Sequence, residues 1–221
     1  INGYILKPTN FDPSKRYPVV MTQYSGPGSQ SVLDKWTIDW EYYLVSKGFI
    51  VACVDGRGTG GRSRAYETSV YMQLGKLETE DQVAGAEYMR TLPYVDDKHI
   101  GIYGWSYGGY ETLMAMSTSN GTYQAGVAIA PVTDWRYYDT IYAERFMRTP
   151  NENNEGYEQS APITHAEKLK GDLLIISGTA DDNVHYLNTL QYSAALIEAG
   201  IQFDTQISGS YTHLRAHETG R

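Results

Sequence analysis

The chain has 221 residues, which is long enough for one domain with a hydrophobic core of its own. Hydrophobic residues make up 41% of it and charged residues 20%, and these proportions are ordinary for a globular protein. The formal net charge of -8 argues against a nucleic acid as partner, because phosphate backbones repel an acidic surface. The sequence contains no apolar run of about 18 residues that could span a membrane.

Apolar strand-like runs alternate with segments of helical spacing along the chain. The predicted strands cover residues 17–24, 49–54, 99–103, 124–130, 173–177 and 202–207. The predicted helices cover residues 40–48, 80–92, 110–117 and about 187–199. This alternation predicts an α/β protein with a mostly parallel central sheet, helices on both faces and ligands beyond the carboxyl ends of the strands. A polar stretch at residues 150–162 is expected to be a surface loop rather than a domain boundary.

The most informative segment is Gly104-Trp-Ser-Tyr-Gly108, which contains the pattern Gly-x-Ser-x-Gly between a predicted strand and a predicted helix. In that context the pattern indicates the nucleophile elbow of an α/β-hydrolase fold, with Ser106 exposed at a tight turn. The flanking glycines are expected because a Cβ at either position would clash in the turn. The start of the helix offers backbone N–H groups to a developing oxyanion. The alternative interpretation is a plain glycine turn.

A serine nucleophile needs a histidine base, and the histidine needs a carboxylate that holds its tautomer. In this fold the acid follows a late strand and the histidine follows the last one. Asp181 and Asp182 both follow the predicted strand 173–177, and both could instead cap the next helix. His213 and His217 are the two histidines that follow the last predicted strand. Topology alone leaves the choice within each pair open.

Several longer segments occur in one order and carry a family resemblance. Over about residues 4–207 the chain resembles the prolyl oligopeptidase family of serine peptidases, and within it the dipeptidyl peptidase IV branch. The segments that carry it are Tyr24-Ser-Gly-Pro-Gly-Ser-Gln30, Asp55-Gly-Arg-Gly-Thr-Gly60, Gly104-Trp-Ser-Tyr-Gly-Gly-Tyr110, Ala130-Pro-Val-Thr-Asp-Trp-Arg-Tyr-Tyr-Asp139, Tyr142-Ala-Glu-Arg145 and Gly178-Thr-Ala-Asp-Asp-Asn-Val-His185. The resemblance implies serine peptidase activity that needs neither cofactor nor metal. Cys53 is the only cysteine, which itself excludes an internal disulfide and a cysteine metal site.

The resemblance also assigns catalytic roles. It implies that Asp181, rather than Asp182, is the acid, and that the phenol of Tyr24 stabilises the oxyanion together with the backbone N–H of Tyr107. One such donor is typically worth a factor of about 10²–10³ in rate. Without the family, Tyr24 would be interpreted as a core tyrosine at the end of a strand.

The resemblance further implies an apolar specificity pocket for proline. Its expected walls are Val132, Trp135, Tyr138, Tyr142 and Val184, and Asn183 is expected to bind the carbonyl of the residue before proline. Aromatic walls suit a flat pyrrolidine ring. The implied substrates are peptides with proline or alanine second from the amino terminus. From the residues alone, the aromatic cluster would equally be core, and Asn183 would be a helix cap.

Two features depart from the family pattern. Family members carry an N-terminal β-propeller that holds the free amino terminus of the substrate, and this sequence contains no counterpart. After Ile207 the expected histidine loop and final helix are replaced by residues 208–221, which resemble a translated sequencing adaptor. We therefore expect a peptidase domain over residues 1–207 and an anomalous tail over 208–221, with His213 in the family's register but with the wrong neighbours.

These departures leave alternatives open. One is an acylaminoacyl-peptidase or oligopeptidase of the same family, and another is a catalytically inactive fragment that lacks its true histidine. Family analogy implies a homodimer for the intact parent, and for bacterial members a place in the periplasm or cell envelope. The residues of this chain carry neither expectation by themselves.

Overall fold

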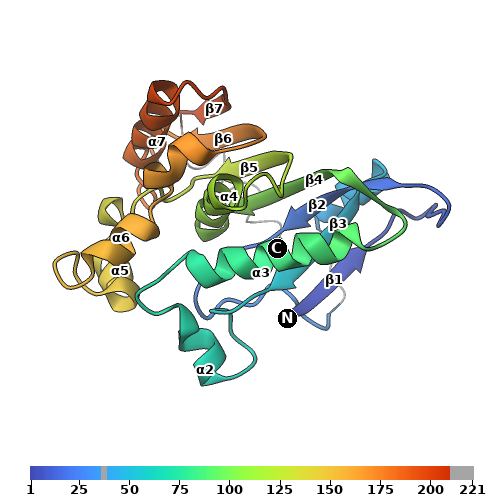
Figure 1. Cartoon of the computed structure of the whole chain (residues 1–221), viewed down its shortest axis with the longest axis horizontal. Coiled ribbons are helices and arrows are strands. Elements are labelled where there is room, and N and C mark those ends of the chain that lie inside the picture. Colours follow the sequence, from blue (N-terminus) through green and yellow to red (C-terminus); the bar gives the residue numbers. More distant parts are fainter. Residues whose placement is uncertain (36–38, 210–221) are drawn as a thin grey trace.

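The computed structural model describes residues 1–35 and 39–209, and these form a seven-stranded sheet with helices on both sides (Figure 1). The strands are β1 Asn2–Leu6, β2 Tyr17–Thr22, β3 Ile50–Asp55, β4 Val95–Trp105, β5 Ala125–Ile129, β6 Asp172–Gly178 and β7 Asp204–Ser208. Their order in the sheet is β1-β3-β2-β4-β5-β6-β7. β1 pairs antiparallel with β3, and the other neighbours pair in parallel. The predicted α/β-hydrolase architecture with a mostly parallel sheet is confirmed.

The longer helices are α3 Lys76–Arg90, α4 Tyr107–Thr118, α5 Thr140–Met147 and α7 Leu187–Glu198. Shorter helices are α1 Glu41–Ser46, α2 Arg64–Glu67 and α6 Asn154–Gln159. The described residues also contain the 3₁₀ segments η1 Thr68–Val70, η2 Trp135–Tyr137 and η3 Pro162–Lys168.

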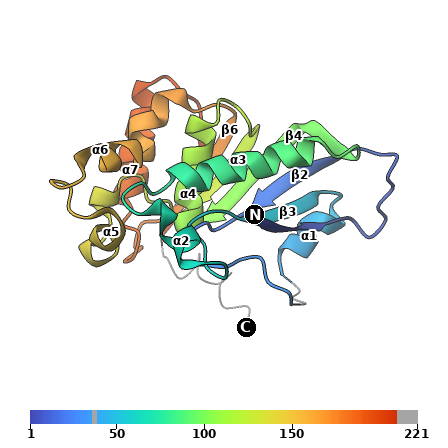
Figure 2. The ribbon, with the colours of Figure 1, turned by 60° about the horizontal axis from the view of Figure 1, so that its bottom comes forward.

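Two adjacent residues of β2 show that helices cover both faces of the sheet. A Cβ added to Gly85 of α3 would lie 3.2 Å from the terminal methyl group of Met21, so Met21 points toward α3. The hydroxyl of the next residue, Thr22, donates a 2.7 Å hydrogen bond to Glu41 of α1. Successive side chains of a strand point to opposite faces, so α3 and α1 lie on opposite sides (Figure 2).

The buried apolar residues form two clusters. The larger one lies between the sheet and the helices α3, α4 and α7, and includes Met21, Ile102, Met116 and Leu196. The smaller one lies behind the start of α4 and joins it to η2 and α5 through Tyr107, Tyr110, Trp135 and Met147. The second cluster matters for function, because it supports the residues that were predicted to form the specificity pocket.

The structure corrects several sequence predictions. Residues 150–162 are not a loop throughout, because they contain α6, whose Tyr157 is 1% exposed and packs into the second cluster. The helix predicted over 80–92 begins at Lys76, since its first turns bury polar residues that an apolar pattern does not register. β1 and α5 were not predicted at all: β1 is a short strand at the edge of the sheet, and an Asp139 cap rather than an apolar repeat starts α5.

Candidate active site

The turn between β4 and α4 has the strained backbone of a nucleophile elbow. Ser106 adopts φ 57° and ψ -115°, a region that non-glycine residues rarely occupy. Its N–H donates a 2.8 Å hydrogen bond to the carbonyl of Ile129, and its own carbonyl accepts one of 3.0 Å from the N–H of Tyr110. These bonds hold the strained residue between β5 and the first turn of α4, which supports the elbow over a plain glycine turn.

The two glycines of the elbow are required by close backbone contacts. A Cβ on Gly108 would lie 2.5 Å from the carbonyl oxygen of Gln23, and a Cβ on Gly104 would overlap the carbonyl group of Gly108. Gly108 and Gly104 are not among the glycines with positive φ, so the requirement is one of space alone. The expected role of both glycines is confirmed.

Gln23 fastens the elbow to the end of β2. Its side-chain amide donates hydrogen bonds to the Gly108 carbonyl at 2.7 Å and to the Thr112 hydroxyl at 3.2 Å. The Ser25 hydroxyl donates back to the Gln23 side-chain carbonyl at 3.0 Å, and the Gln82 amide of α3 donates to Ser25 at 3.1 Å. This buried relay joins β2, α3 and α4 beneath the site, and no sequence pattern predicts it.

Tyr107 follows the serine and is the first residue of α4. The first N–H groups of a helix have no acceptor within the helix, which is what the predicted oxyanion role of its backbone N–H requires. Its side chain is 2% exposed, and its hydroxyl donates a 2.8 Å hydrogen bond to Glu78 of α3. Its ring centroid lies 6.2 Å from that of Tyr24 and 5.5 Å from that of Trp135.

Tyr24 lies just beyond the carboxyl end of β2, and Ser106 lies beyond the carboxyl end of the neighbouring strand β4. It is 40% exposed, whereas a core tyrosine at this position would be buried. Gly26 gives the phenol ring its space, because a Cβ there would lie 2.6 Å from a ring carbon of Tyr24. The exposure favours a surface role for the phenol over the core interpretation.

Asp181 follows β6 and presents one satisfied and one unsatisfied carboxylate oxygen. Its Oδ1 accepts hydrogen bonds from the backbone N–H groups of Asn183 and Val184, both at 2.9 Å. Its Oδ2 is buried and has no hydrogen-bond partner within residues 1–35 and 39–209. The side chain is 5% exposed, and this burial raises the pKa of the carboxyl despite the two N–H donors. Asp182, the competing candidate, is exposed.

The predicted base lies outside the described residues. His213, like His217, falls in the part of the chain that the structure does not describe, and the tail predicted over 208–221 falls almost entirely there as well. Of the predicted acid–base pair, the structure therefore describes Asp181 alone.

The predicted pocket residues form one cluster of stacked and edge-on rings. The Trp135 ring stacks on Tyr142 with centroids 5.8 Å apart, and both contact the ring of Tyr138 edge-on. Trp135 is 1% exposed, whereas the two tyrosines are only half-buried and reach the surface. Burial raises the pKa of Tyr142, with the Tyr24 phenol as a further cause. The cluster thus forms an aromatic wall next to the elbow, in which Trp135 is buried and the two tyrosines reach the surface.

Three further residues connect this wall to the Asp181 loop. Val132 and Val184 are 2% and 5% exposed and share the second core cluster with Trp135. The Tyr138 hydroxyl donates a 2.9 Å hydrogen bond to the side-chain oxygen of Asn183. Asn183 is exposed and supplies no side-chain cap to α7, so the helix-cap alternative is wrong.

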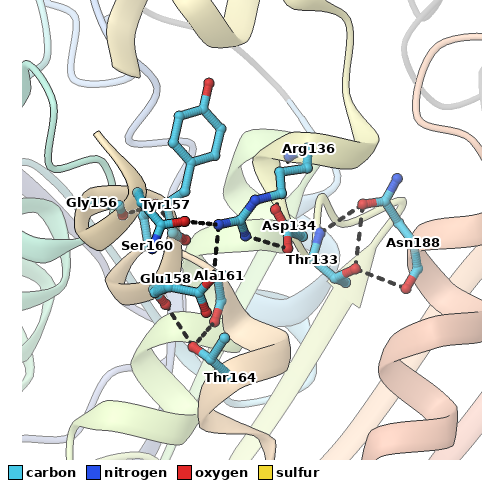
Figure 3. Close-up of polar contacts among 11 residues, drawn as sticks. Thr133, Asp134, Arg136, Gly156, Tyr157, Glu158, Ser160, Ala161, Thr164 and Asn188 are labelled. Atoms are coloured by element: carbon cyan, nitrogen blue, oxygen red, sulfur yellow. Dashed lines mark hydrogen bonds and ion pairs between the residues drawn. The ribbon is translucent and has the colours of Figure 1, made fainter. Parts of the chain in front are cut away.

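A polar network anchors the segment that carries these residues (Figure 3). The Thr133 N–H and hydroxyl donate to the Asn188 side chain and backbone, both at 2.9 Å, and so tie the segment to α7. The Arg136 guanidinium donates to Asp134 at 3.0 Å and to Glu158 of α6 at 2.7 Å. Because Thr133 and Arg136 are both anchored in this way, the backbone at Trp135, which lies between them, is held in place.

The described residues contain no grouping of three or more His, Cys, Asp or Glu side chains that could hold a metal ion. None of the helices in the described ranges has the length and apolarity to cross a bilayer.

Comparisons with known proteins agree with this geometry. A model of the prolyl oligopeptidase family matches residues 36–221. A crystal structure of Porphyromonas gingivalis dipeptidyl peptidase 4 superposes with a TM-score of 0.92 at 54% identity, over 98% of this chain and 32% of that one.

Curated relatives give the same assignment. A "Probable dipeptidyl-aminopeptidase B" of Metarhizium robertsii is 44% identical over 218 residues, which is 96% of this chain and 24% of the relative. One of the same description from Ajellomyces capsulatus is 50% identical over 199 residues, or 86% of this chain and 22% of the relative. The chain thus spans about a quarter of the length of these relatives. With its fold, its elbow and these matches, the chain belongs to the prolyl oligopeptidase family and is a homologue of the dipeptidyl aminopeptidases.

Proposed function

We propose that this chain carries the active site of a serine exopeptidase that cleaves after proline and releases N-terminal X-Pro dipeptides. Ser106 attacks the carbonyl carbon of the proline, and a histidine, nominally His213, takes its proton. Collapse of the tetrahedral intermediate breaks the peptide bond, and the same histidine protonates the leaving amine. Water then hydrolyses the acyl ester and restores the serine. Asp181 orients the histidine throughout.

The observation that carries the proposal is that Ser106 and Asp181 both lie beyond the carboxyl ends of parallel strands, where they could share one histidine. Ser106 stands in a strained turn after β4, and Asp181 stands after β6 with a buried oxygen that lacks a donor among the described residues. A buried carboxylate oxygen without a donor is costly, so it is expected to meet a partner. A histidine that enters between the two residues would donate one ring N–H to Asp181 and accept the Ser106 hydroxyl proton on its other ring nitrogen.

Oxyanion stabilisation comes from two donors in this account. The Tyr107 backbone N–H lies at the start of α4, and the exposed Tyr24 phenol packs against the Tyr107 ring. Specificity comes from Trp135, Tyr138, Tyr142, Val132 and Val184, whose apolar surfaces suit a pyrrolidine ring, with Asn183 as donor to the preceding carbonyl. Preference for a free amino terminus needs groups beyond these, so dipeptide release is the part of the proposal that rests on the relatives' names.

We also propose that residues 1–207 form the peptidase domain and that residues 208–221 replace the family's closing segment. A substitution pair tests the base. If His213 acts, His213→Ala should abolish reaction with a serine-directed probe and His217→Ala should not. Loss of reaction in His217→Ala instead would make His217 the base, and no reaction in the folded wild type would mean that the true histidine is absent and that the chain is an inactive fragment.

Active-site-directed phosphonates test the substrate class without requiring a propeller. A diphenyl phosphonate of proline should label Ser106 at least about tenfold faster than the leucine analogue, because the aromatic wall is shaped for the smaller ring. Tyr142→Ala should reduce this ratio. Equal rates for proline and leucine would favour an oligopeptidase or acylaminoacyl-peptidase specificity instead.

A further inference from the structure

Two glutamates are buried side by side beneath the elbow with no basic partner. Glu78 of α3 is 1% exposed and Glu111 of α4 is fully buried, and neither forms an ion pair within the described residues. One oxygen of each carboxyl also lacks a hydrogen-bond partner there. Burial of an unpaired carboxyl is unfavourable for folding, so such a group calls for a functional explanation.

The two glutamates differ in what they contact. Glu111 is reached by the Thr79 hydroxyl at 2.8 Å and so stays within the packing of α3 against α4. Glu78 instead accepts the 2.8 Å hydrogen bond from the Tyr107 hydroxyl. Tyr107 is the residue next to Ser106, and its ring is wedged among Tyr24, Tyr110 and Trp135.

We propose that Glu78 is a positioning residue for the active site: by holding the Tyr107 hydroxyl it fixes the ring, and through the ring the backbone N–H beside Ser106. The inference rests on the proposed function, in which that N–H stabilises the oxyanion. A donor that is misplaced by a fraction of an ångström loses much of its value, so an anchor for the side chain is an anchor for catalysis. The ring also backs Tyr24, the second proposed donor.

The surroundings of Glu78 make its hold on Tyr107 dependent on pH. The groups that face it are Asp81 on its own helix, Tyr107, Tyr110 and Glu111 from α4, and Tyr142 from α5. None of these is a cation, and burial raises the pKa of Glu78 to about 7. An ionised carboxylate accepts a stronger hydrogen bond than a neutral one, so the anchor is firmest above that pH.

Three variants and one matched control separate positioning from mere packing. Glu78→Gln keeps an acceptor for the Tyr107 hydroxyl but cannot ionise, whereas Tyr107→Phe removes the donor alone. Glu78→Ala removes the anchor and its volume. Glu111→Gln is the control, because it neutralises the neighbouring buried glutamate without contact to Tyr107.

Two readouts are taken on the same folded samples of the whole chain. The first is hydrogen exchange at the Ser106 and Tyr110 amides, which hold the elbow through their bonds to Ile129 and Ser106. It needs no catalysis. The second is the rate of labelling by a fluorophosphonate as a function of pH. A histidine base titrates near pH 6.5, so the wild type should lose reactivity through two ionisations below pH 8.

The proposal expects about tenfold faster exchange at the two amides and about tenfold slower labelling at pH 8 in Tyr107→Phe. Glu78→Ala, where it folds, should do the same. Glu78→Gln, which is neutral at every pH, should label more slowly than the wild type at pH 8, though less so than Tyr107→Phe, and should retain only one ionisation. Glu111→Gln should match the wild type in both readouts.

Unchanged exchange in Tyr107→Phe, or two ionisations retained in Glu78→Gln, would overturn the proposal. If no variant labels, the wild type included, but the exchange difference is present, the anchor stands and the proposed function of this chain fails. The two failures are therefore distinguishable.

Discussion

The elbow and the aromatic wall lie at one end of the sheet but are held by different means. The elbow, Gly104–Gly108, is held by backbone contacts, in which a strained serine and two glycines leave no space for a Cβ. The rings of the wall, Trp135, Tyr138 and Tyr142, are held by packing on one another, on a segment whose ends are tied down by side-chain hydrogen bonds. The proposed nucleophile is thus fixed by the backbone, whereas the proposed specificity wall is fixed by apolar contacts between side chains. Substitutions in the elbow should accordingly cause large losses in the free energy of unfolding, whereas losses in the wall should grow with the size of the side chain removed.

The largest effect is expected for Gly108→Ala. The added methyl group would meet the Gln23 carbonyl at 2.5 Å, and the backbone on both sides is bound in the sheet and in α4. We expect a loss of about 3 kcal/mol or more in the free energy of unfolding, measured by urea titration.

Gly48→Ala is the matched control for this substitution. Gly48 has φ +91°, but nothing lies within 4 Å of the position that an added methyl group would take, so it reports backbone strain without a clash. It should cost about 1 kcal/mol. Equal costs at the two sites would show that close contacts do not hold the elbow.

The next effect concerns the pH dependence of stability. Burial raises the pKa of Glu78 from 4.5 to about 7, so the folded protein keeps a proton that the unfolded chain releases between these values. The resulting stabilisation is complete below about pH 4.5 and is lost as pH rises through about 7. Relative to Glu78→Gln, the wild type should therefore lose on the order of 3 kcal/mol between pH 4.5 and 8.

Glu152→Gln is the control for that measurement. Glu152 is exposed, and hydrogen bonds from Thr149 lower the pKa of its carboxyl, so its linkage has the opposite sign. A parallel pH dependence of the wild type and Glu78→Gln would contradict the burial of an ionisable group beneath the elbow.

A graded effect is expected in the wall. Trp135→Phe keeps an aromatic ring but removes part of a side chain that is 1% exposed, so unfolding should become easier by about 2 kcal/mol. Trp40→Phe is the comparison, because Trp40 is 40% exposed and packs on Tyr103, and its loss should stay below about 1 kcal/mol. A Trp135→Phe variant that fails to fold would contradict this, because it would show that the wall tolerates substitution no better than the elbow does.

The smallest effect is expected for Tyr138→Phe. It removes one hydrogen bond to an exposed asparagine and keeps the ring contacts, so stability should change by about 0.5 kcal/mol or less. The proline-over-leucine labelling ratio should also persist, because the apolar surface is unchanged. A lost ratio would show that the hydroxyl, rather than the ring, sets specificity.

The same contrast explains what the sequence could predict. The elbow was predictable because its glycines and serine lie within five residues and their roles follow from backbone geometry. The partners of that segment come from other elements: Gln23 approaches from β2 and Glu78 from α3. The residues next to Gln23 and Glu78 in the sequence do not predict these contacts. A glutamate in the first turn of a helix ordinarily indicates an exposed side chain that interacts favourably with the helix dipole.

Secondary structure shows the same limit. The parallel strands were predictable from their apolar runs, whereas α6 lies in a polar stretch and is fixed by the burial of Tyr157 and by the ion pair of Glu158 with Arg136. The wall was predicted only through family resemblance, since an aromatic run alone does not distinguish pocket from core. In the structure the aromatic run is partly core and partly surface: Trp135 is buried, whereas Tyr138 and Tyr142 reach the surface.

The central claim is that Ser106 and Asp181 belong to one catalytic triad. Fluorophosphonate labelling, with the adduct mapped by mass spectrometry, tests it most directly in the wild type and in Ser106→Ala, Asp181→Asn and Asp182→Asn. The account predicts an adduct on Ser106 that is absent in Ser106→Ala, is slowed by about 10³-fold or more in Asp181→Asn, and is unchanged within about twofold in Asp182→Asn. No adduct on the folded wild type, or slowing by Asp182→Asn instead of Asp181→Asn, would contradict it.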